Sequence, residues 1–118
     1  MPNYEVDFYK NQTGVCPMTE FLDSVEAKMR AKILRMILLL EQNGNNLREP
    51  YSKPLGEGIF ELRVQHSSNI SRVLYFFTVG SKIILTHGFI KKTPKTPRRE
   101  IVLAKKYRTE YLNRERSK

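Results

Sequence analysis

The chain has 118 residues, of which 40% are hydrophobic and 28% charged, the composition of an ordinary globular protein of one domain. Its formal net charge is +9, and its single cysteine, Cys16, excludes an intramolecular disulfide framework. The longest apolar run, 36–40, is too short to span a bilayer, and the N-terminus lacks an apolar signal-peptide core. We therefore expect a cytoplasmic protein without a membrane partner.

The positive charge lies in the last third of the chain. Residues 1–81 carry nine Lys or Arg and nine Asp or Glu, whereas residues 82–118 carry twelve and three, a net charge of +9. A basic patch of this kind is typical of proteins that bind nucleic acid, an acidic protein or an anionic surface. A solvated helix face is the alternative, but the uncompensated repulsion among the cations favours a partner.

The first half of the chain predicts one strand and two helices. Large and polar side chains alternate over 4–9, with Tyr4, Val6 and Phe8 on one side, which is typical of a half-buried strand. Pro17 begins a short helix, and Ser24 is expected to cap a longer helix that ends near Gln42. The apolar stripe of this longer helix consists of Ile33, Met36, Ile37 and Leu40, widened by Leu34 and Leu38.

The second half predicts a meander followed by a helix. The segment 45–58 is rich in Pro, Gly and Asn and reads as a loop. Strands are expected over 59–66, 70–79 and 82–90, joined by short turns and therefore antiparallel. A basic C-terminal helix of about 97–116 follows, with Thr96 as its cap and Pro97 at its first position, while residues 113–118 are expected to fray. Its inner stripe consists of Ile101, Ala104, Tyr107 and Tyr111.

This order of elements predicts an α+β domain over residues 1–118, with the helices packed on one face of a twisted sheet. The opposite face is then open, and Arg63 and Arg72 stand on neighbouring strands of it. Two guanidinium groups there can clamp one phosphate, because each presents a fork of donors. The equally weighted alternative is a cross-strand ion pair with Glu61 or Glu57.

Further side chains suit nucleic-acid chemistry. His87 can move a proton near neutral pH, although a lone histidine in a strand is more often structural. Tyr51 can stack on a base, and a solvated loop is the alternative for it and for the nearby Lys53. The cations expected to contact the phosphate backbone are Lys53, Lys91, Lys92, Lys95, Arg98 and Arg99. The sequence contains no carboxylate cluster with metal-ligand spacing and no Gly-rich phosphate loop, so no cofactor is expected.

Several motifs together resemble the RelE/ParE toxin superfamily, and most closely its HigB-type, phage-derived branch. The motifs are Lys53-Pro54-Leu55, Glu61-Leu62-Arg63, Arg72-Val73-Leu74-Tyr75, His87-Gly88-Phe89 with Lys91-Lys92, and Thr96-Pro97 through Ala104. The likeness covers nearly the whole chain, and the combination is much more specific than any one piece.

The resemblance implies the toxin of a type II toxin–antitoxin system, an endoribonuclease that cuts mRNA in the ribosomal A site without a metal. In such toxins the RNA 2′-hydroxyl attacks the neighbouring phosphate and basic side chains stabilise the charged transition state. By position, Arg63, Arg72 and Lys53 match basic residues of the family motifs. The implied partners are the ribosome, mRNA and a helix-turn-helix, HigA-like antitoxin.

The chain departs from the family pattern at its end, because it continues through a basic helix where several members stop. The proton-transfer group therefore stays open among His87, Tyr107 and a lysine. The His87-Gly88 pair also resembles the ParE branch, whose members inhibit DNA gyrase. A gyrase inhibitor and a non-catalytic nucleic-acid-binding module remain the alternative functions.

Overall fold

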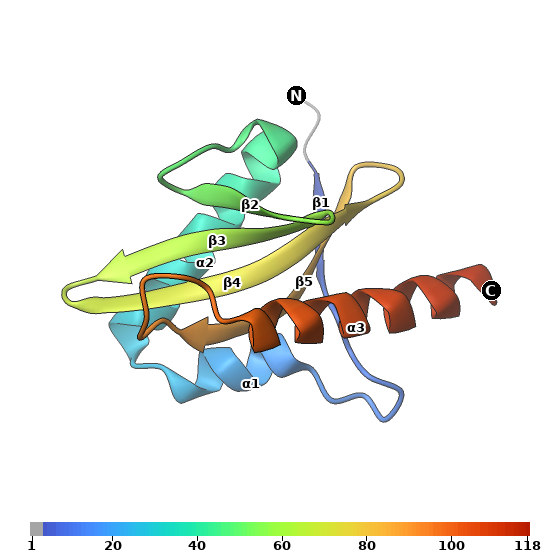
Figure 1. Ribbon diagram of the computed structural model, residues 1–118, viewed down its shortest axis with the longest axis horizontal. Coiled ribbons are helices and arrows are strands. Elements are labelled where there is room, and N and C mark those ends of the chain that lie inside the picture. Colours follow the sequence, from blue (N-terminus) through green and yellow to red (C-terminus); the bar gives the residue numbers. More distant parts are fainter. Residues whose placement is uncertain (1–3) are drawn as a thin grey trace.

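The computed structural model describes residues 4–118 (Figure 1). The elements are β1 (Glu5–Phe8), α1 (Pro17–Ser24), α2 (Ala27–Asn43), the 3-10 helix η1 (Gly44–Asn46), β2 (Ser52–Gly56), β3 (Ile59–His66), β4 (Asn69–Thr78), β5 (Lys82–Ile90) and α3 (Arg98–Arg116). The strands form one sheet in the order β1-β5-β4-β3-β2, in which β1 runs parallel to β5 and the other pairs are antiparallel. The predicted α+β class and element order are confirmed.

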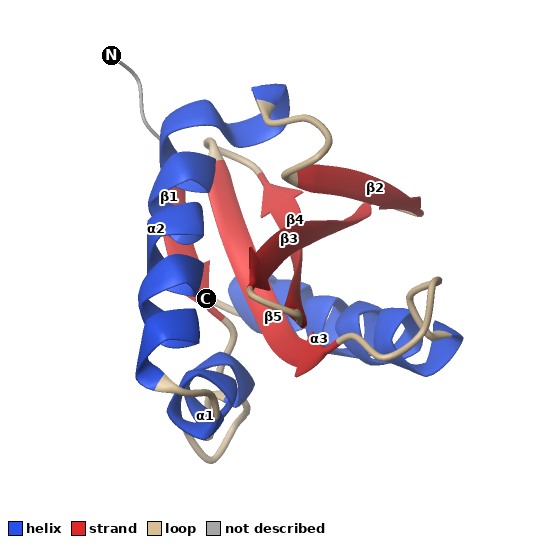
Figure 2. Cartoon of the chain, turned by 90° about the vertical axis from the view of Figure 1, so that its left-hand side faces the viewer, coloured by secondary structure: helices blue, strands red, loops and turns tan. Residues whose placement is uncertain are grey.

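The helices cover both faces of this sheet, so the expectation that they share one face is wrong. Figure 2 shows α2 and α3 on opposite sides of the strands. On β4, Val73 and Tyr75 pack with α1 and α2, whereas Leu74 and Phe76 pack with α3. Side chains alternate between the faces of a strand, and β4 is apolar on both, so each face needs a cover.

Within residues 4–118 no helix is both long and apolar enough to cross a membrane.

The junction between α1 and α2 differs from the predicted cap. Ser24 is the last residue of α1, and its hydroxyl donates to the Phe21 carbonyl at 2.7 Å. α2 begins at Ala27 without a side-chain cap. Instead, Arg30 donates from Nε to the Leu22 carbonyl at 2.7 Å and from Nη2 to the Val25 carbonyl at 2.9 Å, which satisfies the end of α1.

The apolar stripe of α2 is narrower than predicted. Ile33, Ile37 and Leu40 are buried against the sheet as expected, together with Met29. Leu34 and Leu38 are not part of it, because they are 43% and 55% exposed on the outer side of the helix. Helical periodicity places a residue on a face, whereas the width of the buried face depends on what packs against the helix.

Two segments predicted as irregular are ordered. The segment 45–58 contains β2, an edge strand in which Lys53 lies opposite Glu61 and Pro54 opposite Phe60. Proline is tolerated on such an edge because its missing N–H costs no ladder bond. Residues 113–116 stay helical, and Arg114 bonds to the Lys10 carbonyl and lies 5.5 Å from the centre of the Tyr9 ring.

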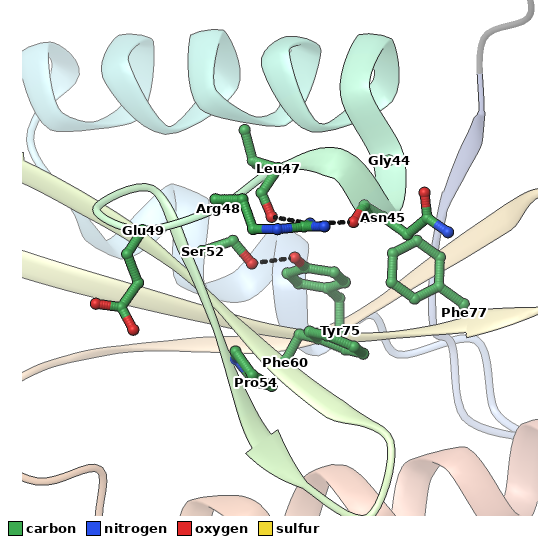
Figure 3. Close-up of a pocket in the computed structure, with 10 residues that line it drawn as sticks. All are labelled: Gly44, Asn45, Leu47, Arg48, Glu49, Ser52, Pro54, Phe60, Tyr75 and Phe77. Atoms are coloured by element: carbon green, nitrogen blue, oxygen red, sulfur yellow. Dashed lines mark hydrogen bonds between the residues drawn. The ribbon is translucent and has the colours of Figure 1, made fainter.

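An aromatic anchor holds the segment that leads into β2. Figure 3 shows Phe60, Tyr75 and Phe77 in one pocket with residues of the segment 44–54, and the Ser52 and Tyr75 hydroxyls hydrogen-bonded to each other. The rings of Phe60 and Tyr75 stack with their centres 5.5 Å apart. Since Ser52 is buried in this contact, the backbone position of the preceding residue, Tyr51, is determined by the core.

The two faces of α2 make a matched test of the packing. Leu40→Ala removes a fully buried side chain and should lower the free energy of unfolding by about 2–5 kcal/mol. Leu38→Ala, on the exposed side, should change it by about 0.5 kcal/mol or less. Urea unfolding followed by circular dichroism measures both, and equal losses would contradict this assignment of the faces.

Candidate nucleic-acid interface

The sheet register brings the two predicted arginines together. Arg63 on β3 lies directly opposite Arg72 on β4, and Arg72 lies opposite Phe89 on β5. The neighbouring row on the same face consists of Glu61, Leu74 and His87. α3 begins over this second row, where His87 contacts Glu100 of its first turn, and extends away from the arginines. The arginine row therefore lies on the part of the face that α3 leaves uncovered.

A single buried carboxylate connects this cluster. The Oε2 atom of Glu61 accepts a hydrogen bond from Arg63 Nε at 3.1 Å, and its Oε1 atom lies 3.5 Å from Arg72 Nε. The Thr96 hydroxyl donates to the same Oε1 atom at 2.5 Å. The sequence left an ion pair with Glu61 or Glu57 as an alternative, and the structure shows the pair with Glu61. Glu57 bonds instead to Lys105 of α3.

Thr96 thus has a different role from the predicted helix cap. Its hydroxyl is used by Glu61, and α3 begins at Arg98 after Pro97 without a side-chain cap. This contact and the Lys91 amide, which donates to the Ile70 carbonyl of β4 at 2.8 Å, tie the segment 91–97 to the sheet. The segment carries Lys91, Lys92 and Lys95. The basic segment is therefore held close to the two arginines.

The charges of the cluster act on one another. Burial lowers the pKa of the Arg72 guanidinium, Glu61 opposes this shift and Arg63 adds to it. A guanidinium nevertheless remains charged at neutral pH. Burial also lowers the pKa of the Lys91 amine, and Arg72 contributes in the same direction because it is a nearby like charge. Lys91 therefore belongs electrostatically to the arginine cluster.

Two hollows adjoin Arg63. The first, here called the loop hollow, lies between β2 and the segment 91–97 and has a volume of about 280 Å³. Its polar lining includes Lys53, Glu61, Arg63, Lys95 and Thr96. The second, here called the edge hollow, has a volume of about 330 Å³. Arg63 and Arg72 line it together with Lys32, Met36, Pro50, Tyr51, Val64, Gln65 and Ile70.

The remaining predicted cations form a rim. Lys92, Arg98 and Arg99 are exposed. Arg98 Nη2 lies 3.8 Å from Glu57 Oε2, and Arg99 Nε lies 3.8 Å from Glu100 Oε2, distances typical of weak surface pairs. The structure thus gathers Arg63, Arg72, Tyr51, Lys53, Lys91 and Lys95 and leaves these three side chains at the margin.

His87 is not in either hollow. It is 5% exposed, its Nε2 atom lies 2.9 Å from Glu100 Oε1, and its Nδ1 atom lies 3.2 Å from the Thr86 hydroxyl. A carboxylate only accepts, so Nε2 carries the proton in this contact. Burial lowers the pKa of His87, and Glu100 opposes the shift. The geometry is that of a buried histidine joining β5 to α3.

Packing explains why position 88, next to His87 in the sequence motif, is a glycine. A Cβ atom built there would lie 2.3 Å from the Phe21 ring of α1. Only glycine therefore admits this close approach of helix and strand.

Sequence reasoning missed several residues of the site. The sequence pattern predicts only a capping role for Thr96, and it does not distinguish Lys32 or Gln65 from other surface residues. The Glu61-Leu62-Arg63 spacing was a usable signal, because residues two apart in a strand share a face. No local signal links Lys32 of α2 to Tyr51, since their proximity depends on the packing of α2. Among residues 4–118 no group of three or more His, Cys, Asp or Glu side chains is placed to hold a metal ion.

Fold and site define a class: a five-stranded α+β protein with a basic, hollowed patch on the uncovered part of one sheet face. The chain belongs to the Gp49-like family of phage-derived proteins, because the family model described as "Phage derived protein Gp49-like (DUF891)" matches residues 20–109. All the residues that line the two hollows lie within this matched span. No protein with a curated description matches the chain.

The shared carboxylate can be tested through stability. Glu61→Gln removes the buried charge that faces Arg72 and Arg63, and it should lower the free energy of unfolding by about 3–5 kcal/mol. The matched control is Glu57→Gln, which loses only surface contacts with Lys105 and Arg98 and should have a much smaller effect. Urea unfolding of both variants provides the comparison, and an unchanged midpoint for Glu61→Gln would show that Glu61 does not connect the cluster.

His87 predicts a dependence of stability on pH. Because its pKa is lower in the folded protein than the ordinary 6.5, the unfolded chain takes up a proton first as the pH falls. The contribution of the buried, neutral His87 to the free energy of unfolding is fully present above about pH 6.5. It falls as the pH drops below that value, by at most about 1.4 kcal/mol per pH unit. The difference in unfolding free energy between wild type and His87→Gln should therefore shrink from pH 7.5 to pH 5. A difference that stays constant over this range would contradict the burial of a neutral imidazole.

Proposed function

We propose that this protein is the toxin of a type II toxin–antitoxin system, a ribosome-dependent endoribonuclease that cleaves mRNA and so inhibits translation. The observation that carries the proposal is the pair of guanidinium groups opposite each other on β3 and β4, joined by Glu61 and bordered by lysines. The motif resemblance to HigB-type toxins and the membership of a phage-derived family point in the same direction.

In the proposed reaction the RNA 2′-hydroxyl attacks the adjacent phosphate and displaces the 5′-oxygen of the next nucleotide. Negative charge grows on the phosphate oxygens, and Arg63 and Arg72 stabilise it as fixed donors. Their Nε atoms face Glu61, and within residues 4–118 neither terminal nitrogen of Arg63 has a hydrogen-bond partner. These donors are available to a phosphate. The proposed chemistry uses the charged side chains of the protein and no metal.

Of the three proton-transfer candidates in the sequence, Lys91 is the one we favour. His87 is buried against Glu100, and Tyr107 stacks on Tyr9 with the ring centres 4.4 Å apart. Lys91 is half-buried beside Arg72, and a lowered amine pKa brings it closer to the range in which a lysine exchanges protons.

We propose that mRNA and ribosomal RNA bind across the site and its rim, with the enzyme acting in the cytoplasm. The contacts are assigned to Lys53, Tyr51, Lys91, Lys92, Lys95, Arg98 and Arg99. The net charge of +9 in residues 82–118 supports this assignment, because phosphate contacts dominate the affinity of such interfaces. The proposed protein partner is a helix-turn-helix, HigA-like antitoxin that inhibits the toxin.

Two other functions have an observation in their favour. The His87-Gly88 pair resembles ParE-type gyrase inhibitors, although His87 is buried and Gly88 packs against Phe21. A non-catalytic nucleic-acid-binding module is compatible with the basic rim alone. The first would block DNA supercoiling with translation unaffected, and the second would bind nucleic acid with strong salt dependence and no effect on growth.

Arg63 offers the sharpest test of the nuclease. Its side chain is 25% exposed, so Arg63→Ala should fold while losing a donor to the transition state, with a drop of about 100- to 1,000-fold in cleavage rate. Induction of wild type should arrest growth with cut mRNA, detected by primer extension, and induction of Arg63→Ala should not. Arg35→Ala, which removes an exposed arginine of α2, is the matched control and should remain toxic.

Arg72→Lys serves as a second variant, because it retains the buried charge beside Glu61 and loses the fork of donors. Growth arrest by the wild-type protein with mRNA intact would overturn the proposed cleavage.

A further inference from the structure

The edge hollow lies where the sheet loses a strand. β2 begins at Ser52, opposite Leu62, and the last contact on this side of β3 is the Arg63 amide donating to the Tyr51 carbonyl at 2.8 Å. Beyond this point the edge of β3 at Val64 and Gln65 is unpaired within the described sheet. Lys32 and Met36 of α2 form another wall of the hollow. The hollow thus combines side chains from β3, β4, α2 and the segment before β2.

The aromatic wall is fixed in position while its ring stays accessible. Tyr51 is 47% exposed, yet its amide donates to the Arg48 carbonyl at 2.9 Å and its carbonyl accepts from Arg63. The next residue, Ser52, is buried in the aromatic anchor of Figure 3. An exposed ring on a rigid backbone loses little entropy when a planar group stacks on it. Every nucleobase has such a planar face.

The inner wall carries a buried cation with unused donors. Arg72 is 6% exposed, its Nε atom makes no hydrogen bond among residues 4–118, and its Nη1 atom has one long bond of 3.4 Å to the Ser71 carbonyl. Because Nε is buried toward Glu61, an anion in the hollow would accept from the terminal nitrogens, of which Nη1 has only that one long bond. Arg63 lines the same hollow, so both arginines of the cluster border it.

The other polar side chains of the hollow can distinguish one base from another by hydrogen bonding. The amide of Gln65 offers both a donor and an acceptor, and its own bond to the Ser67 carbonyl is long, at 3.4 Å. Lys32 adds a donor from the side of α2. At about 330 Å³ the hollow lies near the lower end of the range of small-ligand pockets, about 300–1,000 Å³.

We propose that the edge hollow is a nucleotide subsite. One nucleotide places its base against Tyr51 and its phosphate against Arg63 and Arg72, and Gln65 and Lys32 contact the edge of the base and set a preference among bases. This inference rests on the proposed function, because it makes RNA the ligand of the same cluster. It assigns Gln65 and Lys32 to RNA binding in addition to the residues above, and it makes these two side chains the cause of a preference for certain bases.

The experiment compares nucleoside 5′-monophosphates with inorganic phosphate as probes of the full chain. Binding is followed by ¹H–¹⁵N NMR, with the Gln65 side-chain amide as a local signal. The wild-type protein should bind at least one monophosphate about tenfold or more tighter than phosphate. Tyr51→Ala should weaken nucleotide binding about 5- to 100-fold and leave phosphate binding unchanged. Tyr51→Phe, which keeps the ring, should retain nucleotide binding.

Base preference is the second readout. Gln65→Ala should reduce the difference in affinity among the four monophosphates, whereas Gln42→Ala, on an exposed part of α2 outside the hollow, should not. Monophosphates that bind no tighter than phosphate, or a Tyr51→Ala loss that is equal for both probes, would overturn the base subsite. Nucleotide binding by a protein that cleaves no mRNA would uphold the subsite and reject the nuclease, so the two proposals fail separately.

Discussion

The arrangement of this protein around its basic face depends on one buried carboxylate. Glu61 lies on β3, contacts arginines of β3 and β4, and accepts a hydrogen bond from Thr96 just before α3. A buried charge is costly unless it is paired and hydrogen-bonded, so Glu61 requires the arginines as much as they require it. The same contact orients the guanidinium groups with their Nε atoms inward, which is the preorganisation that an anion site needs.

Two acidic side chains determine where α3 begins on the sheet. Glu61 bonds to Thr96, and Glu100 in the first turn of α3 bonds to His87. The other end of the helix is held by Tyr9, whose hydroxyl donates to Glu110 and whose ring stacks on Tyr107. Burial, with Glu110 as a further cause, raises the pKa of Tyr9 to about 12, so this donor stays protonated at neutral pH. α3 is thereby kept off the arginine row, and the site stays open.

The basic residues divide into two groups with different physical roles. Arg63, Arg72 and Lys91 are buried or half-buried, so salt screens their interactions less than those of exposed charges. Lys92, Arg98 and Arg99 are exposed and screened by salt, which suits a long, sequence-independent contact with a polyanion. A substitution of the buried Arg72 changes fold and chemistry together, whereas one of the exposed cations changes mainly affinity.

The sequence by itself determined the kinds of elements, their order and the side chains available for chemistry. Helix and strand periodicity and turn residues are local properties, which is why they can be predicted without the tertiary structure. It placed Arg63 and Arg72 on neighbouring strands and the excess charge in residues 82–118. Only the tertiary structure decided that α3 covers the second face, that His87 is buried, and that Lys32 and Gln65 meet Tyr51. These outcomes depend on strand register and helix packing, in which residues far apart in sequence compete for the same space, and no local pattern encodes that competition.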